Sequence, residues 1–75
     1  MPRHPAIEAI VEWFDYDHLP AGPVRQTSVE INSLVTTLLP SLPDDPETTE
    51  GLRKILEAKD CFVRAQVRKQ RQTNA

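Results

Sequence analysis

The sequence predicts an all-α protein with a single small domain that is stable only as an oligomer. Apolar residues recur at helical spacing along the chain, and no strand-like alternation is present. Prolines divide the chain into three segments. At 75 residues, with one cysteine and therefore no intrachain disulfide, a monomer would have a marginal core. We therefore expect one domain over residues 1–75, assembled into a homo-oligomeric helical bundle.

The first expected element is a short helix from Pro5 to near Asp15. A proline fits the first helical position, because its missing N–H would have no partner there. Residues 1–20 then comprise this N-terminal helix and an aromatic turn that follows it. The apolar face of the helix has i, i+3, i+4, i+7 spacing and consists of Ile7, Ile10, Val11 and Phe14.

The second expected helix has one broad apolar stripe, and two signals compete for its start. Pro23 would be its first residue after a cap at Gly22. Alternatively, Thr27 and Glu30 have the spacing of a capping box. We favour the earlier start. The apolar stripe consists of Ile31, Leu34, Val35, Leu38, Leu39 and Leu42.

The third expected helix begins after a proline-rich loop. Pro40 ends the second helix, because proline removes a backbone donor and clashes with the preceding turn. Asp45 is then an N-cap and Pro46 the first helical residue. Two helices joined by a short loop are expected to pack as an antiparallel hairpin over residues 21–72, with a frayed tail at 73–75. The third helix has its own apolar stripe, formed by Leu52, Ile55, Leu56, Phe62, Val63 and Val67.

Charge is distributed unevenly along the chain. Residues 1–50 hold nine acidic and two basic side chains, whereas residues 51–75 hold seven basic and two acidic ones. This asymmetry favours head-to-tail docking of subunits or an anionic ligand on the last helix. A solvated basic helix end that complements its own dipole explains it equally well. No apolar run approaches the ~20 residues that span a bilayer, so we expect a cytoplasmic protein without a membrane partner.

Motifs for catalysis are absent from the sequence. There is no glycine-rich phosphate loop and no histidine beside a recognisable nucleophile. Asp15, Asp17 and His18 lie close together, but without a fourth ligand they fit a polar turn better than a metal site. We therefore expect a protein that is not an enzyme and has no cofactor or metal.

The segment 14–20 displays aromatic rings where the first helix has ended. Tyr16 and His18 lie beside Pro20, and such rings can stack on a nucleobase, worth about 1–3 kcal/mol per base in single-strand binders. The alternative is that the aromatic residues are core or interface anchors. This alternative is the stronger one for Trp13 and Phe14, and the two interpretations are balanced for Tyr16.

Two basic residues have positions that suit an anion. Lys59 falls inside the apolar stripe of the last helix, where it must reach solvent, pair or meet an anion. Arg25 lies in the first turn of the second helix, where backbone N–H groups favour phosphate. Thr27 and Ser28 beside it either add hydroxyl donors or cap the helix.

Two stretches carry a resemblance to a known family. They are Tyr16, His18, Leu19 and Pro20, and the run LRKILEAKDCFVRA at residues 52–65. Over residues 14–68 the chain resembles the phage anti-CBASS cyclic-nucleotide sponges, which share a helical-hairpin domain with phage anti-Thoeris sponges. The resemblance implies a homohexamer in the host cytoplasm. It also implies that cyclic di- and trinucleotide messengers are sequestered without cleavage, in pockets shared between protomers, so that the immune effector is not activated.

The resemblance also implies roles for particular residues. Tyr16 would stack on a base, and Arg25 would bind phosphate with help from the hydroxyl of residue 27 or 28. An arginine of the second hairpin helix, Arg64 or Arg68, would complete the contacts. Such a symmetric interface suits a cyclic dinucleotide, which has two base faces and two phosphates.

Two other functions are compatible with the same sequence. One is a helical interaction protein whose aromatic residues only mediate assembly and which has no nucleotide ligand. The other is a DNA-binding regulator that places the last helix in a groove. The second is disfavoured because that helix begins with Asp45, Glu47 and Glu50, which would repel phosphate. We therefore expect no nucleic-acid polymer as a partner.

Overall fold

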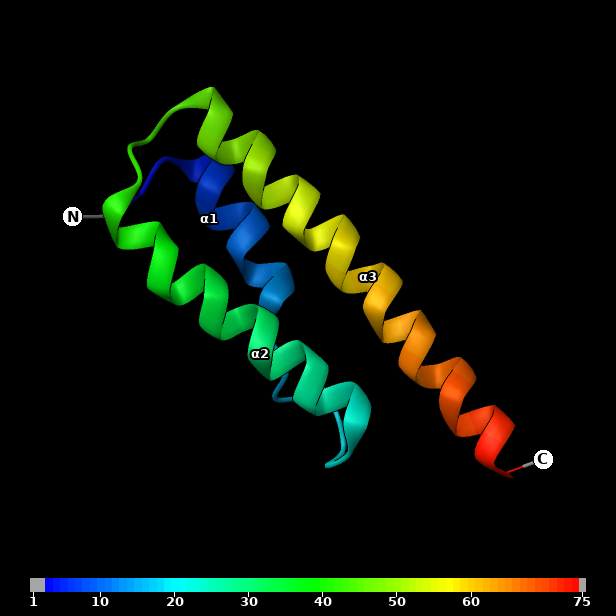
Figure 1. Cartoon of the computed structure of the whole chain (residues 1–75). Coiled ribbons are helices and arrows are strands. Elements are labelled where there is room, and N and C mark those ends of the chain that lie inside the picture. Colours follow the sequence, from blue (N-terminus) through cyan, green and yellow to red (C-terminus); the bar gives the residue numbers. More distant parts are fainter. Residues whose placement is uncertain (1–2, 75) are drawn as a thin grey trace.

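The computed structural model describes residues 3–74 and is helical, with no strand among those residues (Figure 1). Helix α1 (Pro5–Val11) continues into a 3-10 turn, η1 (Glu12–Phe14). Helix α2 (Pro23–Leu38) ends in a second 3-10 turn, η2 (Leu39–Ser41), and α3 (Pro46–Asn74) completes the chain. The all-α prediction is confirmed. No described helix is both long and apolar enough to cross a membrane.

The helices form an elongated body of 47 × 20 × 17 Å. Helices α2 and α3 contact each other and run in opposite directions, and α1 packs against α3 while η1 packs against α2 (Figure 1). The core lies where these elements meet. Among the described residues, its buried apolar side chains are Ile7, Phe14, Val35 and Leu52.

Local signals in the sequence explain where α2 and α3 begin. Helix α2 begins at Pro23, the earlier of the two starts considered. Gly22 before it has φ +145°, a conformation that side chains with a Cβ rarely adopt, so glycine is required there. Thr27 does not cap this helix, because its Oγ1 donates to the carbonyl oxygen of Pro23 at 2.9 Å. At α3 the expected cap is confirmed, since Asp45 Oδ1 accepts from the N–H of Glu47 at 2.8 Å.

The far end of α3 differs from the sequence prediction. The helix continues to Asn74, so the tail expected to fray from residue 73 is helical up to that point, and Ala75 lies outside the described residues. Gln and Arg near this end are good helix formers, which explains why the helix persists. With 29 residues against 16 in α2, α3 is longer by about 20 Å, at about 1.5 Å per residue. Its C-terminal part therefore extends past the beginning of α2 (Figure 1).

Arg3 ties the N-terminal segment to the end of α2. Its guanidinium donates to the carbonyl oxygen of Leu42 and to Asp44 Oδ1, each at 2.7 Å, and also to the carbonyl oxygen of Leu39. Asp44 Oδ2 accepts from the backbone N–H of His4 at 2.9 Å. The hydrogen bond from Arg3, followed by that from His4, lowers the pKa of the Asp44 carboxyl. The Leu39 carbonyl oxygen also accepts from the N–H of Leu42 at 3.0 Å, so Arg3 adds further hydrogen bonds at the end of η2.

Candidate ligand-binding site

The aromatic turn and the beginning of α2 meet at Tyr16 and Arg25. The turn is closed by a hydrogen bond from the N–H of Leu19 to the carbonyl oxygen of Tyr16 at 3.0 Å. The guanidinium carbon of Arg25 lies 5.4 Å from the centroid of the Tyr16 ring, within the range of a cation–π contact. Both residues are partly buried. The structure therefore places two of the predicted ligand contacts side by side.

The N-terminus of α2 adds backbone donors to this pair. Gln26 donates its N–H to the carbonyl oxygen of Gly22 at 2.9 Å, which is the first hydrogen bond of the helix. The N–H groups of Val24 and Arg25 precede that bond, Pro23 has none, and no side chain caps the helix. The positive end of the helix dipole thus lies beside the positive Arg25 side chain. This arrangement favours an anion such as phosphate.

The two hydroxyls near Arg25 have different environments. Thr27 is partly buried, and its hydroxyl keeps oxygen lone pairs while donating to Pro23. Ser28 is completely buried, and its Oγ has no hydrogen-bond partner in the part of the chain described. In this conformation Ser28 is out of reach of a surface ligand. Thr27 is therefore the more accessible of the two predicted hydroxyls.

The remaining turn residues and Lys59 lie nearby but differ in environment. His18 and Pro20 are exposed in the same loop as Tyr16. Lys59 is partly buried, and its Nζ donates to the carbonyl oxygen of Trp13 at 2.6 Å. Among the fates considered for a lysine in an apolar stripe, the structure thus shows pairing within the chain.

Arg64 and Arg68 lie on the outer side of α3. At about 100° per residue, they are about 120° and 160° around the helix from the buried Leu52. Both are exposed, and Arg64 also donates to the sulfur of Cys61 at 3.4 Å. One chain therefore does not bring these arginines to the face of α3 that packs on the rest of the fold.

Asn32 is a residue that the sequence interpretation missed. It lies in the middle of α2, and its Nδ2 donates to the carbonyl oxygen of Phe14 at 3.1 Å. An asparagine in a helix interior is mildly unfavourable, which is the only local sign of a special role. Its partner is 18 positions away, so the contact could not be inferred from local sequence.

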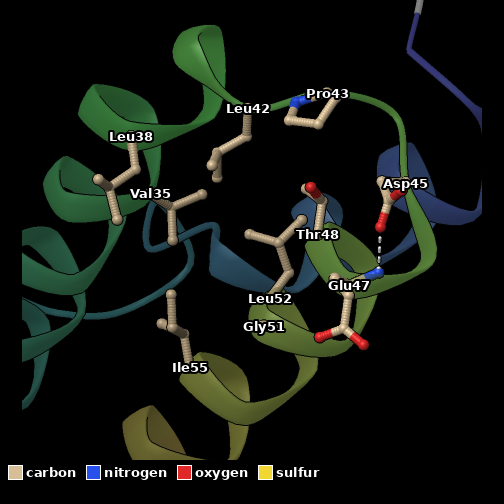
Figure 2. Close-up of a pocket in the computed structure, with 10 residues that line it drawn as sticks. All are labelled: Val35, Leu38, Leu42, Pro43, Asp45, Glu47, Thr48, Gly51, Leu52 and Ile55. Atoms are coloured by element: carbon tan, nitrogen blue, oxygen red, sulfur yellow. Dashed lines mark hydrogen bonds between the residues drawn. The ribbon is translucent and has the colours of Figure 1, made fainter.

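A groove between α2 and α3 is open to solvent (Figure 2). It has a volume of about 420 Å³, and no residue of α1 lines it. Figure 2 shows aliphatic side chains from both helices facing this space, with Asp45 and Glu47 at one end. Such a surface suits apolar side chains better than a phosphate. The aliphatic side chains that line it are Val35, Leu38, Leu42, Leu52 and Ile55.

Neither a metal-binding group nor a match to a known protein adds to the description of this site. Among the described residues, no three or more His, Cys, Asp or Glu side chains are grouped to hold a metal ion. No protein-family model matches the chain, and neither a curated protein nor a solved structure matches it. The family resemblance therefore stays a prediction from the motifs at residues 16–20 and 52–65.

Proposed function

We propose that the protein binds and sequesters cyclic di- and trinucleotide messengers without cleaving them, as a phage anti-CBASS protein in the host cytoplasm. The observation that carries this proposal is the contact between Tyr16 and Arg25 at the uncapped N-terminus of α2. A cyclic nucleotide presents flat bases and phosphates, and this site combines a ring, a cation and backbone donors. The resemblance to the sponge family supports the same conclusion from the sequence.

The energetics favour ligand binding over the resting contact. A partly exposed cation–π pair is worth about 0.5–1 kcal/mol. Base stacking on an aromatic ring is worth about 1–3 kcal/mol, and an arginine gains further from charge-assisted hydrogen bonds to phosphate. A base can therefore stack on Tyr16 while Arg25 turns to the phosphate. The resting pair keeps both side chains near their working positions.

The position of Arg64 and Arg68 supports a pocket shared between subunits. These arginines lie on the outer face of α3, so we propose that they reach the Tyr16 site of another protomer. In a symmetric assembly each half of a cyclic ligand then meets the same ring and the same cation. We propose a homohexamer, as the family resemblance implies, with the α2–α3 hairpin as its unit of assembly.

Apolar exposure supports self-association. Leu34, Leu38 and Phe62 are 45%, 41% and 53% exposed, although each belongs to a helical apolar stripe. A single chain thus covers only part of the stripes that the sequence provides. Opposite net charge in the two parts of the chain favours contacts between copies, since the acidic part of one can meet the basic part of another.

An alternative function is a helical interaction protein without a nucleotide ligand. The 69% exposure of the Trp13 side chain favours it, because exposed aromatic residues are typical anchors of protein interfaces. This alternative predicts a stable oligomer that does not respond to cyclic nucleotides.

The test is isothermal titration with a panel of cyclic di- and trinucleotides, together with native mass measurement of the same sample. Linear dinucleotide and duplex DNA serve as ligand controls. We expect tight binding of cyclic ligands only, with the ligand recovered intact. No heat and no mass shift with any cyclic ligand would refute the proposal and favour the interaction protein.

Variants separate ligand contacts from assembly contacts. The double change Tyr16→Ala with Arg25→Ala is expected to abolish binding and leave helicity and oligomer mass unchanged. The matched control is Arg53→Ala, an exposed arginine paired with Glu50. Loss of the oligomer in the double variant would assign Tyr16 and Arg25 to assembly instead.

A further inference from the structure

Two side chains from different helices hold the end of η1. Lys59 of α3 donates to the carbonyl oxygen of Trp13 at 2.6 Å, and Asn32 of α2 donates to that of Phe14 at 3.1 Å. These are consecutive carbonyl groups at the end of a helical turn, where backbone acceptors lack partners within the helix. Both contacts are long-range, separated by 46 and 18 residues. The two hydrogen bonds therefore connect η1 to both longer helices at one point.

The held segment leads directly into the aromatic turn. Phe14 is completely buried, and the Nζ of Lys59 lies 6.0 Å from its ring centroid. Asp15 then adopts an extended conformation with ψ 146°, which ends the helical turn and leads the chain toward Tyr16. Tyr16 follows only two residues after Phe14. The position of its ring beside Arg25 consequently depends on how firmly the end of η1 is held.

We propose that Lys59 and Asn32 are positioning residues that hold the aromatic turn, so that the Tyr16 ring stays beside Arg25. They do this through backbone carbonyl groups rather than by contacting a ligand. The effect on ligand affinity rests on the proposed function, whereas the effect on the turn does not. This role explains both the lysine within the apolar stripe of α3, Lys59, and the asparagine in the middle of α2, Asn32.

The first experiment measures the turn without any ligand. Nuclear Overhauser contacts between the Tyr16 ring and the Arg25 side chain are recorded for the unmodified protein, Lys59→Met, Lys59→Arg and Asn32→Ala. Methionine keeps an unbranched stem but cannot donate, whereas arginine can still donate to the Trp13 carbonyl. We expect the contacts to weaken in Lys59→Met and Asn32→Ala and to return in Lys59→Arg. Contacts between Val35 and Leu52 report that the core is intact.

Matched controls exclude a general effect of substitution. Lys54→Met makes the same change at an exposed α3 lysine that pairs with Glu50, and Ser33→Ala alters an exposed polar residue of α2. Both should leave the Tyr16–Arg25 contacts unchanged. If Lys59→Met loses its helical circular dichroism, Asn32→Ala still tests whether the contacts to the end of η1 position the turn, because Asn32 makes its contact from α2. Unchanged contacts in both Lys59→Met and Asn32→Ala would overturn the proposal.

The second experiment adds a cyclic dinucleotide. We expect Lys59→Met to bind about tenfold more weakly than the unmodified protein, because apparent affinity falls with the fraction of molecules whose turn is held in the binding conformation. Lys59→Arg should recover most of the ligand affinity lost in Lys59→Met. Its thermal midpoint should equal that of the unmodified protein. If the unmodified protein binds no cyclic nucleotide, the proposed function fails while the contact measurements still decide the positioning role. Full affinity in Lys59→Met despite lost contacts would refute the link from position to binding.

Discussion

Replacing Ser28 with alanine should stabilise the protein. Its hydroxyl is completely buried and has no hydrogen-bond partner among the described residues. Leaving a buried polar group without a partner costs about 1–3 kcal/mol, and alanine adds about 0.5 kcal/mol of helix propensity. We therefore expect Ser28→Ala to raise the free energy of unfolding by about 1.5–3.5 kcal/mol. For a domain of this size each 1 kcal/mol corresponds to about 4–8 °C in the thermal midpoint.

The assay is thermal and urea unfolding followed by circular dichroism at one fixed protein concentration, because self-association would also shift the midpoint. Ser33→Ala is the matched control, since Ser33 is an exposed serine of the same helix and reports propensity alone. If Ser28→Ala is no more stabilising than Ser33→Ala, the buried hydroxyl is satisfied and the reasoning is refuted. Cyclic-nucleotide binding measured on the same variants should not change, because Ser28 does not reach the surface.

Three further predictions follow from the backbone and from the Arg3 contacts. Gly22→Ala should lower the free energy of unfolding by about 1 kcal/mol or more because of the positive φ at this position, whereas Gly51→Ala in α3 should raise it by about 0.5–1 kcal/mol. Chemical unfolding of the two variants compares these effects, and equal effects would show that the backbone conformation at Gly22 does not require glycine. Arg3→Ala should lower the free energy of unfolding by about 1–3 kcal/mol, because it removes the hydrogen bonds to Asp44 and to the carbonyl oxygens of Leu39 and Leu42. Hydrogen exchange should then become faster first at the amides of α1, and unchanged exchange there would show that Arg3 does not hold the N-terminal segment. The pKa of Asp44 is lowered from its ordinary 3.8, so its stabilising contribution is present above that pH and is lost as pH falls through the lower folded value. Asp44→Asn should therefore flatten this acid limb in a pH series of unfolding curves, and a limb of unchanged size would assign it to other carboxyls.

Local signals in the sequence were sufficient for the helix starts. Gly22 with Pro23, and Asp45 with Pro46, define helix beginnings through backbone geometry and capping that involve only neighbouring residues. The proline at position 40 likewise ends α2 within two residues, because its effect on the helix is local. Such features need no knowledge of the tertiary fold.

Contacts between distant segments could not be predicted from the sequence. The ties from Arg3 to Asp44 and from Lys59 to Trp13 span 41 and 46 residues, and nothing in the local pattern selects one carbonyl or carboxylate as the partner. The same limit applies to Ser28, a predicted ligand contact that tertiary packing buries completely. The juxtaposition of Tyr16 with Arg25 was implied by resemblance only, and the structure supplies its geometry.

The attachment of α1 has a consequence for synthesis. A seven-residue helix is far too short to be stable alone in water. Its partners come later in the chain, at Leu39 to Asp44 through Arg3 and along α3 through packing. Because the ribosome delivers a chain from its N-terminal side, α1 emerges before the segments of this fold that cover its apolar face. The packing of α1 on α3 can therefore form only after α3 has left the exit tunnel, and until then its apolar face is open to chaperones and proteases.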